Sequence, residues 1–323
     1  QEAIGHGPLE LVVSGIRQLT SRVRAFELRA RDGGELPPVA AGSHLQLDIT
    51  LPAGKTILRN YSICSNPARR DAYEIAVLRD DDGGGGSLTV HDRFGIGRKL
   101  NCQPPQNHFE LHDDKRPALL IAGGIGITPL KAMAQSLKAR GNEMHLHYAG
   151  RSKAEMAFLE NLQRDFGDDM TIYSSADDKR LNIKQILSSL PKEAVTYVCG
   201  PGSLIDAVVD VAAQLKIDPA SVRFERFGAT VAADARPIQV ELRRSGKQIE
   251  VAADQTILDA MLDAGVESAY SCKAGNCKSC AVKVLDGEAD HRDSALSKAE
   301  RDEYRLICPC VSRAKGTNLS LDI

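Results

Sequence analysis

The residues best suited to chemistry are cysteines near the end of the chain. Five of the eight cysteines fall within the last 52 residues, and three of these follow the pattern Cys272-x4-Cys277-x2-Cys280. Another 29 residues separate Cys280 from Cys310. Four thiolates from one loop and one distant position have the spacing of a plant-type [2Fe–2S] site. The small residues between them let backbone amides approach the sulfur atoms and stabilise their negative charge.

Two alternatives stay open for these thiols. Cys308 lies two residues before Cys310 and competes with it as the fourth ligand. A structural zinc site is the other alternative, although zinc sites usually pair two Cys-x2-Cys units and only one such spacing fits here. On spacing, we expect the ligands to be Cys272, Cys277, Cys280 and Cys310.

Two glycine-containing motifs follow apolar stretches in the middle of the chain. The first, Ala122-Gly-Gly-Ile-Gly-Ile-Thr-Pro129, joins a predicted strand to a predicted helix. Glycines let a ligand approach the backbone, and a helix N-terminus offers unpaired amides to negative charge. The second, Cys199-Gly200-Pro201, ends an apolar strand, where ligands of an open parallel sheet bind. Each motif alone also fits an ordinary turn or a core cysteine.

Two further motifs are weaker. The run Arg59-Asn60-Tyr61-Ser62-Ile63 places a cation, a phenol and a hydroxyl side by side, which could meet a phosphate and a flat ring. A plain strand is its alternative. The run Phe224-Glu225-Arg226-Phe227 comes at the end of the middle module, and its alternative is a capping hydrophobic cluster.

Three predicted modules position these motifs. Up to residue 112 the chain has short, partly alternating apolar stretches separated by turn residues, which predicts an antiparallel barrel. From Pro117 onward, apolar strands alternate with helical stretches, which predicts a parallel sheet with right-handed crossovers. Gly228–Pro237 is small, polar and ends in proline, as interdomain linkers often do. A hairpin and a helix follow, and then the cysteine loop.

The predicted elements follow from apolar periodicity. In the first module the expected strands are Leu9–Gly15, Val23–Ala30, His44–Ile49, Tyr73–Val77 and Ser87–Val90. In the second, the expected strands are Ala118–Ala122, Met144–Tyr148, Met170–Tyr173 and Val195–Cys199. The expected helices there are Pro129–Arg140, Lys153–Phe166, Ile183–Leu190 and Leu204–Leu215. In the third, we expect a hairpin of Ile238–Leu242 and Lys247–Val251, and a helix over Thr256–Ala264.

Composition narrows the classes of function. The chain has 323 residues, of which 42% are hydrophobic and 26% charged, as in ordinary globular proteins. A net charge of −2 and the absence of tryptophan argue against nucleic-acid binding. We also expect no membrane span, because no run of eighteen apolar residues occurs. No signal peptide is evident at the start, so the expected location is the cytoplasm, where thiols stay reduced.

Taken in order, the motifs resemble those of the ferredoxin-reductase superfamily. Arg59-x-Tyr61-Ser62 comes first, then the glycine turn, then Cys199-Gly200-Pro201, and last the cysteine loop. The C-terminal place of that loop is similar to the phthalate dioxygenase reductase class in particular. The segments at 287–293 and 310–315 strengthen this resemblance, which covers nearly the whole chain.

The resemblance implies a multidomain fold. Residues 1–112 would form an antiparallel β-barrel that binds FMN, and residues 113–228 an α/β parallel-sheet domain that binds NADH. A linker over residues 229–236 would lead to an α+β domain of the β-grasp type, residues 237–323, that holds the [2Fe–2S] cluster.

The resemblance also implies which residues hold the flavin. The FMN phosphate and ring would be held by Arg59, Asn60, Tyr61 and Ser62. The other side of the flavin would be lined by Val77, Leu78, Arg79, Gly85, Gly86 and Ser87. Thr128 and Phe227 would reach its ring. At the position of Arg226, the resembled class usually has a small polar residue, so the arginine implies a more cationic flavin edge.

The nicotinamide would be placed by residues of the two glycine-containing motifs, Gly124, Gly126, Thr128, Cys199, Gly200 and Pro201. Asp177 and Asp178 follow the third strand of the middle module. Acids there accept a bond from a ribose 2′-hydroxyl and repel a 2′-phosphate. Arg151, after the second strand, argues mildly for the phosphate. We expect NADH.

The implied function is the reductase component of an oxygenase system, an NADH-dependent flavin and iron–sulfur oxidoreductase. The implied partner is a Rieske-type oxygenase acting on an aromatic acid or methoxy-aromatic, met in a small transient complex. No general acid or base is required of the protein, since the cofactors carry the chemistry. One alternative is a reductase serving a free electron carrier or a haem monooxygenase. The other is a binding protein that holds zinc and a nucleotide without chemistry.

Overall fold

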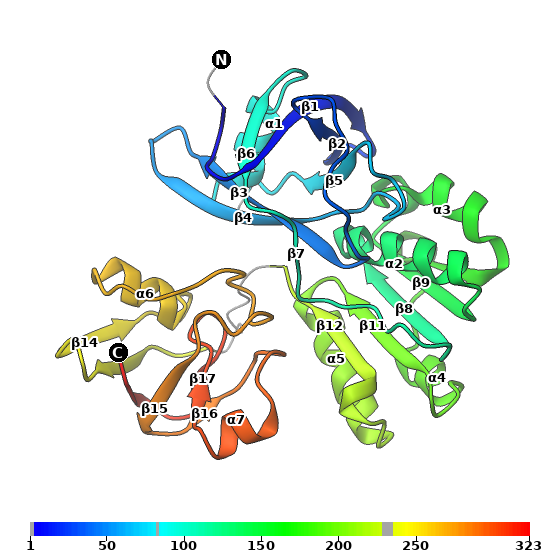
Figure 1. Cartoon of the computed structure of the whole chain (residues 1–323). Helices are drawn as coiled ribbons and strands as arrows, with labels where there is room; N and C mark the ends of the chain where they lie inside the picture. The colour runs from blue at the N-terminus through cyan, green and yellow to red at the C-terminus, as the bar shows by residue number, and fades with distance from the viewer. Residues whose placement is uncertain (1–2, 82–83, 228–234) are drawn as a thin grey trace. The chain divides into compact units, whose positions relative to one another are not determined.

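The chain forms two compact units, Gln1–Phe224 and Glu225–Ile323. The computed structural model describes residues 3–81, 84–227 and 235–323 (Figure 1). Of the predicted linker, residues 229–234 lie outside the described residues.

The first unit opens with two antiparallel sheets, as predicted. One has the order β5-β2-β1-β6 and the other the order β4-β3-β7. Alternate residues of their strands pack into one apolar core that includes Phe26, Leu45 and Tyr73, all fully buried. The strands are β1 Leu9–Gln18, β2 Val23–Ala30, β3 Ser43–Thr50, β4 Thr56–Ser62, β5 Tyr73–Leu78, β6 Lys99–Cys102 and β7 Gln106–Asn107.

A helix replaces one predicted strand of this module. The prediction of a strand over Ser87–Val90 is wrong, because α1 covers Gly86–Arg93. Gly85, at φ 78°, adopts the left-handed conformation and turns the chain into the helix. Gly86, Thr89 and Val90 are buried at helical spacing. Packing of that face therefore outweighs the strand preference of threonine and valine.

The second half of the first unit is a parallel sheet of order β10-β9-β8-β11-β12. Successive residues of β8 face opposite sides, so Leu120 packs in one core and Leu119 and Ile121 in another. Both faces are thus covered, as predicted for crossover helices. The strands are β8 Ala118–Gly123, β9 Met144–Gly150, β10 Met170–Ser174, β11 Val195–Cys199 and β12 Val222–Glu225. The helices are α2 Ile127–Arg140, α3 Leu159–Phe166, α4 Ile183–Ser188 and α5 Gly202–Gln214.

One helix of this module is shorter than predicted. The pattern predicts a helix over Lys153–Phe166, but α3 begins only at Leu159. Phe158 has a positive φ of 61°, which interrupts the helix, and its side chain is buried. A short 3₁₀ turn covers Lys153–Glu155 instead.

The two halves of the first unit share one core. Cys64, Ala76 and Phe109 of the antiparallel module pack in the same cluster of buried residues as Ile127 and Leu130 of α2. The antiparallel and parallel modules are therefore joined by a continuous apolar contact.

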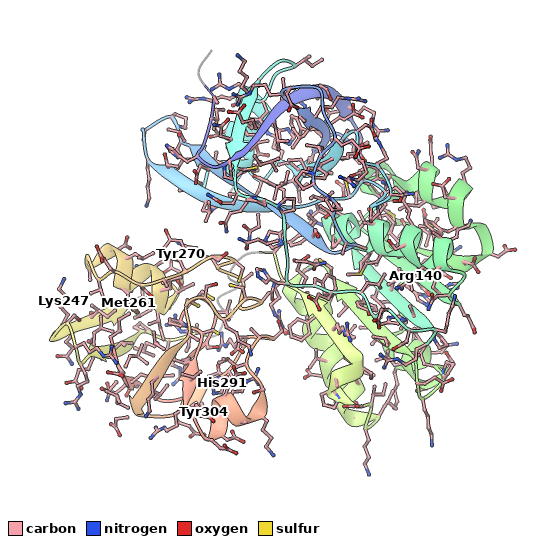
Figure 2. The ribbon with its side chains drawn as sticks, in the orientation of Figure 1. Arg140, Lys247, Met261, Tyr270, His291 and Tyr304 are labelled. Atoms are coloured by element: carbon pink, nitrogen blue, oxygen red, sulfur yellow. The ribbon has the colours of Figure 1, made fainter. Side chains whose placement is uncertain are left out.

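The second unit is a mixed sheet of order β14-β13-β19-β15-β17. Its hairpin follows the predicted boundaries, and α6 packs on the sheet through Met261, which is fully buried (Figure 2). The Thr256 hydroxyl caps α6 by accepting a bond from the Asp259 amide at 3.0 Å. The elements are β13 Ile238–Leu242, β14 Lys247–Val251, α6 Ile257–Asp263, β15 Val282–Asp286, β16 Ala289–Asp290, α7 Lys298–Asp302, β17 Leu306–Ile307, β18 Arg313–Ala314 and β19 Asn318–Leu321.

Among the described residues, none of the helices is sufficiently long and apolar to span a membrane.

Candidate functional site: three cofactor positions

Arg59 lies against the glycine loop that precedes α1. A Cβ on Gly84 would stand 3.4 Å from its Nη2, and one on Gly86 would stand 3.2 Å from its Nε. The helix itself has no side-chain cap and no acidic residue in its first turn. Its first amides therefore stay open to an anion. A guanidinium beside an uncapped helix N-terminus fits the phosphate of FMN.

The rest of the β4 motif lies along the strand that carries Arg59. Tyr61 is half-buried, and burial raises the pKa of its phenol to about 12, so it stays neutral. The Asn60 side-chain oxygen accepts a bond from Gln46 Nε2 at 3.3 Å. Ser62 is buried and stands directly opposite His44 on β3. The strand could therefore offer an aromatic face and polar side chains to a flat ring.

The residues predicted to line the other side of the flavin do not all lie on one surface. Val77 is 1% exposed and its side chain belongs to the barrel core. Arg79 pairs instead with Asp81 at 2.8 Å, across solvent-exposed side chains. The Ser87 hydroxyl accepts a bond from the Asp80 amide at 3.0 Å. The structure thus brings Ser87 of α1 next to Asp80, the residue after Arg79, and it places Val77 in the core.

His44 is a buried residue that the sequence analysis did not single out. Its side chain is enclosed beside Ser62, and neither ring nitrogen has a hydrogen-bond partner among the described residues. The His108 ring lies 5.3 Å away, centroid to centroid. Burial, together with the His108 charge, lowers the pKa of His44 from 6.5 to about 4.

This pKa predicts a loss of stability in mild acid. The unfolded chain takes up a proton near pH 6.5, whereas folded His44 takes it up only near pH 4. The free energy of unfolding should therefore fall by about 3 kcal/mol on this account as the pH drops from 6.5 to 4. In urea titrations over the same pH range, the free energy of unfolding of His44→Gln should fall by about 3 kcal/mol less than that of wild type. His6→Gln, at an exposed histidine, should match wild type; an equal effect of both would refute this assignment.

The two weak glycine-containing motifs of the middle module meet in space. A Cβ on Gly126 would stand 2.2 Å from the Cys199 carbonyl oxygen and 2.6 Å from the Gly200 amide nitrogen. A Cβ on Gly123 would stand 2.7 Å from Pro201 Cδ. Only glycine permits this approach. The glycine turn and the end of β11 therefore form one backbone-lined edge at the carboxyl ends of adjacent strands, where nucleotides bind in open α/β sheets.

Thr128 and Asp177 occupy different parts of the same edge. Thr128 is buried in the first turn of α2, and its hydroxyl donates to the Ile125 carbonyl at 3.0 Å. Asp177 follows β10 and pairs with Lys153 Nζ at 3.4 Å. The Arg151 carbonyl accepts a bond from the Ala176 amide at 2.8 Å. Asp177 is thus a half-exposed carboxylate with basic residues beside it.

The cysteine loop directs backbone amides at its sulfur atoms. The amides of Ala274 and Asn276 donate to Cys272 Sγ at 3.4 and 3.3 Å, and the Cys272 amide donates to Cys277 Sγ at 3.4 Å. Positive φ angles at Lys273, Gly275 and Lys278 turn the chain so that this is possible. Amides aimed at thiolates stabilise a negatively charged cluster.

The thiols lie in two pairs. Cys280 Sγ is 3.3 Å from Cys310 Sγ, while Cys272 and Cys277 form the other pair. Contact with Cys272 lowers the pKa of Cys277 to about 5. Contacts with Cys308 and Cys310 lower the pKa of Cys280 to about 3. Each pair thus favours a thiolate, the form that binds metal.

This arrangement fits a cluster of two irons. In the described part of the chain, no three Cys, His, Asp or Glu side chains converge as ligands of a single metal ion. A [2Fe–2S] cluster shares four thiolates between two irons, so pairs suffice. Both Cys308 and Cys310 are buried beside Cys280, and the 3.3 Å between Cys280 Sγ and Cys310 Sγ agrees with the ligand predicted from spacing.

Asp293 supports this loop and was not identified from the sequence. Its fully buried carboxylate accepts bonds from the Leu296 amide at 2.9 Å and the Ser312 hydroxyl at 3.1 Å, and pairs with Arg301 at 3.2 Å. A Cβ on Gly275 would stand 3.0 Å from the Asp293 Cα. The carboxylate therefore ties the segment after Cys310 to the cysteine loop. Asp293 belongs to the stretch His291-Arg292-Asp293, but nothing in the sequence alone shows that its carboxylate is buried.

Comparison with known proteins agrees with the three predicted modules. Residues 240–315 match the 2Fe-2S iron-sulfur cluster binding domain, and residues 10–111 match the oxidoreductase FAD-binding domain. Residues 98–222 match the N-terminal domain of the dimethylamine monooxygenase subunit DmmA-like family. The solved structure of phthalate dioxygenase reductase aligns over 98% of both chains with a TM-score of 0.71 and 35% identity.

The chain belongs to the phthalate dioxygenase reductase family. Vanillate O-demethylase oxidoreductase from Pseudomonas sp. (strain HR199 / DSM 7063) is 37% identical, over 98% of this chain and all of that protein. The heme-dependent oxidative N-demethylase beta subunit from Ectopseudomonas mendocina (strain ymp) is 39% identical, over 98% of this chain and 99% of that protein.

Membership in this family confirms several predictions. The reductase has the expected multidomain fold of antiparallel flavin module, parallel-sheet nucleotide module and C-terminal iron–sulfur module. It is an oxidoreductase, and its cofactors are a flavin of the expected FMN type, a [2Fe–2S] cluster and NADH. As a reductase component it delivers electrons to an oxygenase.

Proposed function

We propose that this reductase passes electrons from NADH to a Rieske-type oxygenase that acts on an aromatic acid or methoxy-aromatic. FMN held at Arg59 and the start of α1 would supply the chemistry that connects a two-electron hydride donor with a one-electron cluster. The contact between the glycine turn and the end of β11 supports the NADH end of this path, because it forms the backbone-lined edge on which a nicotinamide can be oriented. The similarity to vanillate O-demethylase oxidoreductase supports an oxygenase acting on a methoxy-aromatic.

The proposed residue roles follow the geometry. Arg59, Gly85, Gly86 and Ser87 hold the FMN phosphate, supported by the uncapped start of α1. Asn60, Tyr61 and Ser62 hold the flavin ring. Gly124, Gly126, Thr128 and residues 199–201 orient the nicotinamide. Cys272 and Cys277 bind one iron, and Cys280 and Cys310 bind the other.

For three residues, Leu78, Arg79 and Phe227, the proposed contact with the flavin has a different basis. Leu78 packs against the shared core at the end of β5, and Arg79 is paired with Asp81. Phe227 belongs to the second unit and is 42% exposed. We propose flavin contacts for these residues from the family resemblance alone.

We further propose domain limits of 1–112, 113–228 and 237–323, and a cytoplasmic location, where reducing conditions keep the ligand thiols free.

Asp177 should set the choice between NADH and NADPH. Its carboxylate would repel a 2′-phosphate by about 1 kcal/mol, the Coulomb energy of two charges a few ångströms apart in water. Asp177→Asn is therefore expected to raise the ratio of kcat/KM for NADPH to that for NADH about fivefold. Asp168→Asn is the matched control, because it removes an exposed carboxylate that comes before β10, at the opposite end of the strand from Asp177. An unchanged ratio in Asp177→Asn would place the ribose elsewhere.

The partner can be identified by exchanging acceptors. We expect this chain and NADH to reduce a purified Rieske-type oxygenase under single-turnover conditions. The rate of this reduction should be at least as high as the rate at which the oxygenase forms its product. The similarity to a heme-dependent N-demethylase subunit favours a haem oxygenase as the second candidate. Faster turnover with a haem oxygenase than with any Rieske-type one would overturn the proposed partner and leave the electron path intact.

A further inference from the structure

Lys131 is a buried lysine on α2 to which the proposed function gives no role. Its side chain is 11% exposed, and its Nζ donates to the Cys64 carbonyl at 2.6 Å. The Glu74 carboxylate lies 3.7 Å from the same Nζ. A buried ammonium is costly unless it is paired and hydrogen-bonded, so this contact is specific.

The groups that receive Lys131 are themselves held in place. Glu74 pairs on its other oxygen with Arg17 at 2.5 Å. The Cys64 amide donates to the Glu74 carbonyl at 2.8 Å, and its thiol donates to the same oxygen at 3.2 Å. Within the nucleotide module, the Lys131 ammonium stands 4.9 Å from the ring centroid of Phe158, within cation–π distance. The lysine therefore joins two fixed surfaces.

These surfaces belong to the two modules that must cooperate. Lys131 lies in the same helix as Thr128, one turn further from the glycine turn. Cys64 comes two residues after Ser62, at the end of the strand proposed to hold the flavin ring. The Lys131–Cys64 bond is therefore a short, direct link between the nicotinamide side and the flavin side of the first unit.

The shared core holds the two modules together, but apolar contacts are non-directional and do not aim one backbone atom at another. A charge-assisted hydrogen bond to a carbonyl has a preferred length and direction. Hydride transfer is sensitive to such details, because a displacement of about 1 Å can cost about 100-fold in rate.

We propose that Lys131 is a positioning residue that sets the distance between the nicotinamide site and the flavin site. This inference rests on the proposed sites of the two cofactors. Lys131 touches neither of them; it acts by holding α2, and with it the glycine turn, against the end of β4.

The test is anaerobic stopped-flow reduction of the flavin by NADH in Lys131→Met, with 4-deuterated NADH as a second substrate. At saturating NADH, flavin reduction should slow at least tenfold and show a full deuterium isotope effect. The absorbance of bound flavin and cluster should match wild type. Lys131→Arg, which keeps the charge, should recover most of the rate.

Lys138→Met is a matched control on the same helix. The Lys138 ammonium also bonds a carbonyl, that of Asp165, and stands 5.5 Å from the Phe166 ring centroid. Both of those partners lie within the nucleotide module, so this variant should reduce its flavin at the wild-type rate. If Lys131→Met fails to fold, Glu74→Gln is the second variant, and it too should slow flavin reduction.

The outcomes separate two failures. Wild-type flavin that NADH does not reduce would overturn the proposed function itself. Reduction in wild type with an equal rate in Lys131→Met, or equal slowing by Lys131→Met and Lys138→Met, would overturn the positioning role alone. A lower melting temperature in Lys131→Met without slower flavin reduction would likewise show that the lysine is merely structural.

Discussion

Cys310→Ser is expected to remove the iron–sulfur absorbance and leave the flavin reducible by NADH. The Cys310 sulfur lies 3.3 Å from Cys280 Sγ, so it completes the second pair of thiols. Serine offers a harder oxygen ligand, which suits iron of this kind poorly. Transfer to a protein acceptor should fall about 100-fold or more, while reduction of small dyes, which take electrons from the flavin, continues at the wild-type rate.

Cys308→Ser is the matched variant, because Cys308 is equally buried and also contacts the Cys280 thiol. We expect it to keep the cluster, with altered stability at most. Iron content and visible absorbance of the two purified variants decide the matter. A larger loss of iron in Cys308→Ser than in Cys310→Ser would reverse the ligand assignment. Loss of dye reduction together with the cluster would contradict the proposed order of electron flow.

Gly126→Ala is expected to lower the rate of flavin reduction by NADH about 100-fold, the cost of a displacement of about 1 Å at a reacting centre. Gly126 has a φ of −62°, which alanine adopts without strain. The added Cβ would instead stand 2.2 Å from the Cys199 carbonyl oxygen. Because that atom is backbone, the end of β11 must move, and the nicotinamide edge moves with it.

Gly124→Ala separates this clash from ordinary glycine effects. Gly124 has a positive φ of 53° but no atom within 4 Å of the added Cβ. We expect it to cost about 1 kcal/mol of stability and to change the reduction rate less than Gly126→Ala does. Stopped-flow reduction and thermal melting of both variants make the comparison. Equal rates in Gly126→Ala and wild type would show that the two motifs are not in close contact.

Local patterns in the sequence predicted much of this architecture. The hairpin of Ile238–Leu242 and Lys247–Val251 is found at its predicted limits, because strict alternation and a short turn determine it. The cysteine spacing likewise predicted an iron–sulfur module, which the family match confirms. The residues of the hairpin, and Cys272, Cys277 and Cys280, lie within a few residues of one another, so these signals need no knowledge of tertiary contacts.

Features that depend on distant contacts were not predictable. The helix α1 was expected to be a strand, since the turn at Gly85 and the burial of one helical face depend on the surrounding barrel. Similarly, Lys131 and its partner Glu74 are 57 residues apart, and no periodicity links them. His44 and Asp293 are polar residues that the sequence gives no reason to expect in the interior, and only the fold reveals that each is buried.

The most direct test of the electron path is an anaerobic titration of the purified protein with NADH, followed by visible absorbance. We expect both the flavin band and the iron–sulfur band to bleach, with uptake of more electrons than the two that one NADH supplies. This result requires all three cofactor positions in one chain. Bleaching of the flavin without an iron–sulfur band, or no bleaching with either NADH or NADPH, would contradict the account.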